Sequence, residues 1–403
     1  MNQARVIFIF VTILLDAIGL GLLIPVFPDI LRRLTHNPTQ VSEYYGYFMG
    51  SFALMQFLAS PILGSLSDRF GRKPVLLVSL FGAGIDYIFM AYAPTFTLLF
   101  IGRIISGLTG ASMTVASSYI ADISTDKNRS ANFGMIGAAW GLGFIAGPML
   151  GGFLGTLGPT APFLVAAALN ILNFLFGIFV LPESLPKDMR RKMNLKKLNP
   201  FSSIMKVLRP SAFVVLIWIY FLLFLAGQVH PVNWTLYTQT KFGWSAREVG
   251  LSLSFVGVII AVSQGLLTRL IIPRIGEGAS LTLGIFMYMV SFALFALATK
   301  SWMVYAIIVL FSLTGIAIPA LQSTVTKYIP ANEQGELQGS LVSLGSLSAI
   351  FAPILFTYLF VTFTKNPHHH YFPGAAYLAA SVICALTLFV WVWNLKSRAR
   401  LSS

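Results

Sequence analysis

Charge is scarce in this chain of 403 residues. Asp, Glu, Lys and Arg together make up 10% of it, whereas hydrophobic residues make up 56%. Soluble domains carry about 25% charged residues, so a soluble globular protein is excluded. Cysteine is nearly absent as well, and the single Cys384 excludes an intrachain disulfide. The sequence also lacks a nucleophilic triad, a phosphate loop and zinc-ligand spacing, so we do not expect an enzyme or a metal site.

The sequence is made up largely of long apolar runs. A run of about 20 apolar residues is needed to cross a bilayer as a helix. The sequence predicts an all-α membrane protein with twelve transmembrane helices. The predicted spans are 5–28, 44–66, 74–93, 96–120, 131–156, 160–182, 212–233, 246–272, 279–298, 301–325, 335–363 and 373–395. The first run exceeds the apolar region of a signal peptide, so we expect it to remain as a transmembrane helix.

The basic residues are distributed unevenly along this predicted topology. If both termini are cytoplasmic, 20 of the 27 Lys and Arg residues lie on the inner side, 6 lie outside, and Arg103 lies within the membrane. This asymmetry follows the positive-inside rule. The densest basic block falls in a cytoplasmic linker, 183–210. We expect membrane lipids, rather than nucleic acid, to neutralise the net charge of +14.

The two halves of the chain repeat one another at an offset of 205 residues. Arg69 and Gly71 correspond to Arg274 and Gly276, and "LTG" at 108–110 recurs at 313–315. The repeat predicts two six-helix bundles, 1–182 and 211–403, joined by the basic linker. Parallel repeats of this kind are typical of secondary transporters, whose substrate site lies near the midplane. A structural protein built by duplication is the alternative.

Three charged residues lie inside the predicted spans, away from their ends. Asp16 interrupts "LLDAIGLGLL", Asp86 lies in the third span and Arg103 in the fourth. A charge at the bilayer centre costs roughly 2.5–3.5 kcal/mol on insertion scales, so a role is expected for each. Burial favours a neutral carboxyl group and a neighbouring Arg favours the charged form. We predict a proton-coupling site; a fixed Asp–Arg pair that only holds helices together is the alternative.

The C-terminal bundle has no acid in the interior of its predicted spans, so we expect proton chemistry in the N-terminal bundle. Uncharged polar and aromatic residues are candidates for contacts with a substrate in both bundles. These candidates are Asn170, Asn173, Gln228, Trp234, Gln264 and Gln322. Many small polar residues in the C-terminal bundle are equally suited to close helix packing.

Two motifs resemble those of the major facilitator superfamily. "GSLSDRFGRKP" (64–74) matches the family's signature loop between spans two and three, through Gly64, Asp68, Arg69, Gly71 and Arg72. "GFIAGPMLGG" (143–152) resembles the span-five motif of antiporters, through Gly143, Gly147, Pro148, Gly151 and Gly152. Its glycines allow close packing, and its proline permits bending. This resemblance implies the major facilitator fold and favours export.

Several stretches resemble the tetracycline-efflux branch of that superfamily, among them "LLDAIGLGLLIPVFP" and "GELQGSLVSL". The resemblance implies that Asp16, Asp86 and Arg103 couple transport to protons. It also implies a cytoplasmic charge network of Asp68, Arg72 and Asp122. Gln56 and Gln264 match polar positions that line the substrate cavity in that branch. A His in span eight and an Asp in span nine of the branch are replaced by Ile260 and Tyr288. Another lipophilic substrate is therefore as compatible with the sequence as tetracycline.

Together these features predict a proton-driven exporter of a small amphipathic compound in a bacterial inner membrane. We expect a monomer that needs no cofactor besides the coupling proton. An importer or uniporter of a nutrient or lipid with the same fold, and a receptor or scaffold that does not transport, are the alternatives.

Overall fold

The computed structural model describes residues 2–35, 37–110, 112–124, 129–190, 214–326, 334–366 and 371–401, which contain helices and no strand. The chain divides into two compact units, Met1–Pro200 with Trp244–Ser254, and Phe201–Gly243 with Phe255–Ser403. Most of the predicted linker 183–210 lies outside the described residues. Its boundaries and those of the two predicted bundles therefore stay a prediction.

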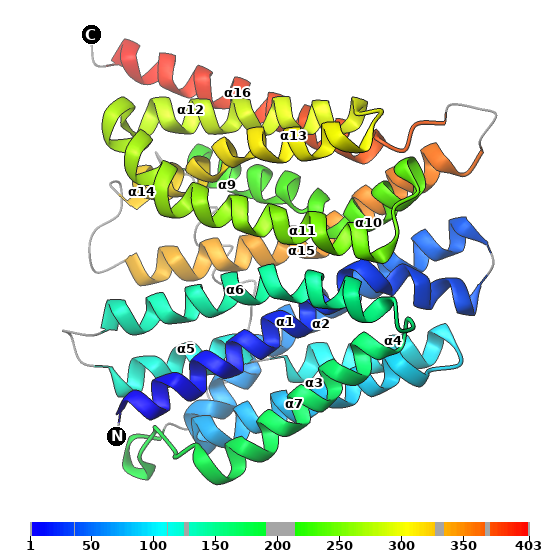
Figure 1. Cartoon of the computed structure of the whole chain (residues 1–403). Helices are drawn as coiled ribbons and strands as arrows, with labels where there is room; N and C mark the ends of the chain where they lie inside the picture. Colours follow the sequence, from blue (N-terminus) through cyan, green and yellow to red (C-terminus); the bar gives the residue numbers. More distant parts are fainter. Residues whose placement is uncertain are drawn as a thin grey trace. The chain divides into compact units, whose positions relative to one another are not determined.

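Seven helices build the main part of the first unit, coloured blue to green in Figure 1. They are α1 (Asn2–Leu34), α2 (Pro38–Phe70), α3 (Arg72–Tyr92), α4 (Phe96–Thr109), α5 (Ser112–Ile123), α6 (Arg129–Gly155) and α7 (Ala161–Val180). The most extensive packing is between α1 and α6, which run side by side. Helix α3 packs between α7 and α4, and α2 packs on α4.

The second unit is built from α9 to α16. Its elements are α9 (Val214–Gly227), α10 (Val229–Phe242), the π turn η3 (Ser263–Leu267), α12 (Thr268–Leu297), α13 (Ser301–Phe311), the 3-10 turn η4 (Ser312–Ile316), α14 (Ala317–Thr326), α15 (Gln334–Thr364) and α16 (Ala375–Leu401). Helix α11 (Ala246–Val262) begins in the part of the chain that groups with the first unit and continues into the second. Helices α12 and α16 form the main pair, and α9 packs on α15 and α16.

Eleven of the described helical segments are long and apolar enough to cross a membrane. The predicted eighth span is the exception, because α11 has only 17 residues before the π turn. The helical path nevertheless continues through η3 into α12 as far as Gly276, where the backbone turns with φ 80°. Residues 246–275 are thus long enough to supply the twelfth crossing. The seventh span differs from its prediction, since α10 continues the path to Phe242.

The internal repeat is visible in the backbone. Gly71 and Gly276, which are 205 residues apart, both have positive φ angles, 106° and 80°. Such angles favour glycine because it has no Cβ. Both copies of the "LTG" segment also interrupt a helix: α4 ends before Gly110, and the second copy forms the turn η4. The duplicated sequence therefore folds into duplicated helix breaks.

Glycines of the predicted antiporter motif bring α6 close to α1. A methyl group at Gly147 would lie 2.7 Å from the carbonyl oxygen of Ile18 and 2.8 Å from Gly21 Cα. Gly143 and Gly151 lie equally close to the α1 backbone. Because backbone atoms of α1 lie this close at all three glycines, the helices would have to separate to admit a side chain.

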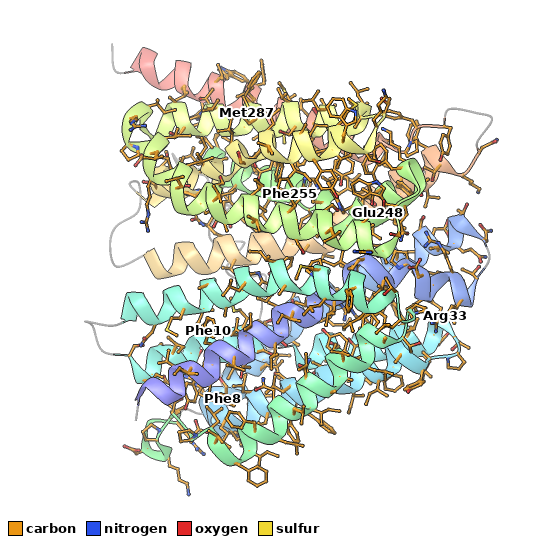
Figure 2. The ribbon with its side chains drawn as sticks, viewed as in Figure 1. Phe8, Phe10, Arg33, Glu248, Phe255 and Met287 are labelled. Carbon is orange, nitrogen blue, oxygen red and sulfur yellow. The ribbon has the colours of Figure 1, made fainter. Side chains whose placement is uncertain are left out.

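A hydrophobic cluster fills the end of the first unit that carries the N-terminus. It joins side chains of α1, α3, α5 and α6, including Ile13, Leu76 and Tyr119. Phe8 points from α1 toward α7, where its ring stacks on Phe176 with centroids 5.6 Å apart (Figure 2). This packing holds the α1–α6 pair in a fixed position relative to α3, which carries Asp86.

We expect Gly147→Ala to destabilise the protein by about 1–3 kcal/mol, the usual range for an overpacked interface. Gly141→Ala is the matched control on the same helix, because a methyl group there would meet none of the described atoms within 4 Å. Thermal unfolding of the purified protein in detergent measures both. Equal unfolding temperatures for the two variants would contradict the close α1–α6 packing.

Candidate functional site

Two of the three predicted intramembrane charges form a buried ion pair. Arg103 on α4 donates from Nη1 to Oδ2 of Asp86 on α3, at 2.8 Å. The two side chains are 2% and 1% exposed. Gly102 makes this approach possible, because a Cβ there would lie 2.9 Å from Phe89 Cβ and 3.2 Å from Asp86 Oδ1. The sequence left open whether Asp16 or Asp86 would pair with Arg103, and the structure brings Asp86 to it.

Two aromatic rings of α2 cover the Arg103 guanidinium. Its Cζ atom lies 4.7 Å from the ring centroid of Phe48 and 4.2 Å from that of Phe52. Such contacts are worth about 2 kcal/mol or more where the cation is desolvated. The positive charge is therefore balanced by one carboxylate and shielded by two π faces, so that the ion pair as a whole adds no net charge to its surroundings.

Asp16 lies in the same region but has a different environment. The residue as a whole is only partly buried, and it lines a small cavity together with Arg103, Gln56 and Trp140. The cavity measures about 60 Å³ and can hold a few water molecules. No ion pair to Asp16 occurs among the described residues, and its hydrogen-bond partner is the Ser112 hydroxyl. Asp16 is thus the carboxyl group in this cavity whose charge is not balanced by a neighbouring base.

The break in the fourth span positions this environment. Helix α4 ends at Thr109, and α5 begins at Ser112, beside Asp16. The start of a helix carries a partial positive charge that favours a nearby anion. Gln56 Nε2 donates to the freed carbonyl oxygen of Gly110 at 3.2 Å. The predicted polar residue Gln56 therefore stabilises the break and also lines the cavity.

A second charged cluster lies at the junction of α2 and α3, within the predicted signature loop. The Arg72 guanidinium donates to the carboxylates of Asp68 and Asp122, the latter at 3.0 Å, and to Ser67 Oγ at 2.7 Å. Arg69 instead lies over the ring of Phe70. Asp68, Arg72 and Asp122 are thus brought together as the resemblance implied. A Cβ atom added at Gly64 would meet, among the described atoms, Thr114 Cγ2 alone, at 3.8 Å.

Glu183, which the sequence analysis did not single out, completes this cluster. Its Oε1 accepts from Arg72 N at 2.8 Å, and its Oε2 accepts from Lys73 N at 3.2 Å. A carboxylate from the segment after α7 therefore caps the N-terminus of α3. Gly71 leaves room for it, since a Cβ there would lie 2.2 Å from Glu183 Oε2. A Glu directly after a proline gives no sequence signal for a contact 110 residues away.

Comparison with known proteins agrees with this architecture. The family model described as Major Facilitator Superfamily matches residues 9–353. The chain is 42% identical to the class C tetracycline resistance protein of Escherichia coli, over 89% of this chain and 90% of that protein. It is 33% identical to the class H protein of Pasteurella multocida, over 96% and 95%. The chain belongs to the Major Facilitator Superfamily.

Solved structures of superfamily members show the same fold. The human organic anion transporter MFSD10 (TETRAN) superposes with a TM-score of 0.70 at 25% identity, over 97% of this chain and 99% of that chain. The nucleoside transporter NupG superposes with a TM-score of 0.74 at 14% identity, over 98% and 99%. The prediction of an all-helical, multi-pass membrane protein is confirmed, and so is the prediction that the chain belongs to the tetracycline-efflux branch of the superfamily.

Two predicted contact residues of this superfamily member are fully packed. Asn173 Nδ2 lies 3.2 Å from Thr12 Oγ1 on α1, and Asn170 Nδ2 donates to the Ala166 carbonyl oxygen at 2.9 Å. Both side chains are less than 5% exposed and neither lines the cavity. In this conformation the two amides hold helices together, and their contact with a substrate stays a prediction.

The candidates in the second unit are spread over several elements. Trp234 is fully buried beside His230, whose ring contacts Trp234, Phe295 and Tyr377 among others. Gln228 lies at the junction of α9 and α10, Gln264 is exposed in the π turn, and Gln322 bonds to Tyr220. No described contact joins the four predicted residues into one site. The buried His230 was missed, although a histidine within an apolar run is a visible signal.

Replacing Asp86 should destabilise the protein far more than replacing Asp16. Asp86→Asn leaves the buried Arg103 without its counter-charge, which costs about 3–5 kcal/mol. Asp16→Asn keeps a partner for Ser112 and removes no ion pair, so we expect a change below about 1 kcal/mol. Thermal unfolding of both variants measures the difference. Equal losses would show that the two carboxyl groups share Arg103.

Proposed function

We propose that this protein is a secondary transporter that exports a small amphipathic compound in exchange for protons. It acts by alternating access in a bacterial inner membrane, with both termini in the cytoplasm. The single observation that carries the proposal is the unbalanced Asp16 carboxyl group in a polar cavity, beside an ion pair that is already neutral. The relation to tetracycline resistance proteins supports the direction of transport.

The electrostatics of the cavity favour exchange. Because Asp86 and Arg103 balance one another, the net charge of the cavity depends on Asp16 alone. An ionised Asp16 attracts a positively charged group of a substrate, and a protonated Asp16 does not. A proton and a cationic substrate therefore exclude one another at this carboxyl group. Exclusion of this kind couples release of one to binding of the other.

The cavity also limits what part of the substrate can reach Asp16. About 60 Å³ admits a small charged or hydrogen-bonding group, whereas drug-sized ligands occupy about 300–1,000 Å³. Phe52, Met113 and Trp140 line the cavity and provide apolar surface beside the carboxyl group. We therefore propose a substrate with a compact cationic or zwitterionic group attached to an apolar, aromatic body. Tetracycline fits that description, and so do other lipophilic cations.

The decisive experiment compares transport by wild type and Asp16→Asn in inside-out vesicles with an acidic interior. We expect the wild type to accumulate tetracycline or the lipophilic cation ethidium as protons leave. Asp16→Asn should lose at least about 90% of this gradient-driven uptake, because an amide cannot exchange protons. Asp29→Asn is the matched control, since Asp29 pairs with Arg32 one turn away and lies outside the cavity.

Gradient-driven uptake by Asp16→Asn at the wild-type rate would remove Asp16 from the mechanism. Counterflow by the wild type that is independent of pH would instead indicate the alternative, an importer or uniporter on the same fold. The two outcomes are separable because counterflow needs no proton gradient.

A further inference from the structure

Tyr87 follows Asp86 on α3, and its side chain lines the same cavity as Asp16, Arg103 and Ser106. The charges of Arg103, Asp16 and Asp86 all act on its hydroxyl group. The residue is 5% exposed, so its ring is held in place by the surrounding helices. Tyr87 therefore lies in the cavity within the field of all three intramembrane charges.

The phenol ring is fixed against α1. A Cβ atom at Gly19 would lie 2.4 Å from Tyr87 Oη and 3.0 Å from its Cζ. Gly19 is three residues beyond Asp16, which places it one helical turn away on the same side of α1. The close approach that this glycine permits brings the hydroxyl group alongside the turn that carries the Asp16 carboxyl group.

The Tyr87 hydroxyl group is also uncommitted. None of the hydrogen bonds between described residues uses the hydroxyl group. The oxygen also does not belong to the set of fully buried polar atoms that lack a partner, so it is not sealed off from the cavity. Two other tyrosines of the chain behave differently. Tyr119 donates to the Pro182 carbonyl oxygen at 2.9 Å, and Tyr237 donates to that of Phe295. A phenol can donate one hydrogen bond and accept another, so Tyr87 has both capacities available to the cavity.

We propose that Tyr87 is a positioning residue of the proton site, whose hydroxyl donates a hydrogen bond to the ionised Asp16 carboxylate across the cavity, directly or through one water molecule. This inference rests on the proposed function, in which Asp16 exchanges protons. A hydrogen bond donated to a carboxylate favours its charged form. Tyr87 therefore promotes proton release from Asp16, while the neutral Asp86–Arg103 pair stays unchanged.

Tyr87→Phe tests this role, because it keeps the ring against Gly19 and removes only the hydroxyl group. The readout is the infrared C=O stretching band of a protonated carboxyl group, followed against pH in the purified full-length protein. Asp16→Asn identifies the band by removing it. We expect the pH at which the band is half lost to rise by about one unit in Tyr87→Phe, the effect of one hydrogen bond to a charged group.

Two further variants separate the hydroxyl from the packing of the ring. Tyr92→Phe, on the same helix with its side chain 66% exposed, is the matched control and should leave the midpoint unchanged. Gly19→Ala pushes the phenol away and should raise the midpoint in the same direction. Adding it to Tyr87→Phe should produce no further rise, since the hydroxyl is already absent.

An unchanged midpoint in Tyr87→Phe would overturn the inference and leave the ring as a packing group on Gly19. A lower unfolding temperature without a shifted midpoint has the same meaning. Failure of the proposed function gives a different result, in which Asp16→Asn removes no titrating band at all.

Discussion

The buried ion pair between Asp86 and Arg103 is the interaction on which the candidate site depends. Separating the pair inside the membrane would leave two uncompensated charges, each costing several kcal/mol. The pair therefore fixes the spacing of α3 and α4, and Gly102 sets how close they come. Its second effect is electrostatic. A pair that is internally neutral leaves the charge of the cavity to Asp16, so one proton is enough to remove the attraction of the cavity for a cation.

The duplicated helix break explains why the polar groups gather at mid-span. A helix that crosses without interruption has no free backbone groups, whereas a break exposes both amides and carbonyl groups. In the first unit Gln56 satisfies the carbonyl oxygen of Gly110, and the new helix start lies beside Asp16. In the second unit Ser263 Oγ of the π turn donates to the carbonyl oxygen of Ser312, in the turn η4 that contains the second copy of the break. The repeat therefore places a helix break in both units, but an acid, Asp16, lies beside the break only in the N-terminal copy.

The sequence was sufficient to identify the fold and the charged residues. Exposing an apolar run to water and placing a charge in the membrane both cost free energy, so these features are informative. It could not choose between Asp16 and Asp86 as the partner of Arg103, since both lie at similar depths and only packing distinguishes them. Tyr87, Ser112 and Trp140 gave no signal, because such residues are common in membrane helices. The predicted role of Asn173 was equally undetermined, as an amide suits a cavity and a helix interface alike, and the structure places it against Thr12.

Helix α3 connects the two charged clusters of the first unit. Its N-terminus holds the network of Arg72 and Glu183, and Asp86 lies fourteen residues along it, which is about 21 Å in a helix. No proline follows Pro74 within α3, and no irregular backbone interrupts the helix. We therefore expect α3 to move as a rigid body. A displacement of Asp86 relative to α1 therefore cannot occur without shifting Arg72 against Asp68 and Asp122. Because hydrogen bonds to charged groups at both ends resist that movement, the first unit is built to move as a whole rather than to bend at its proton site.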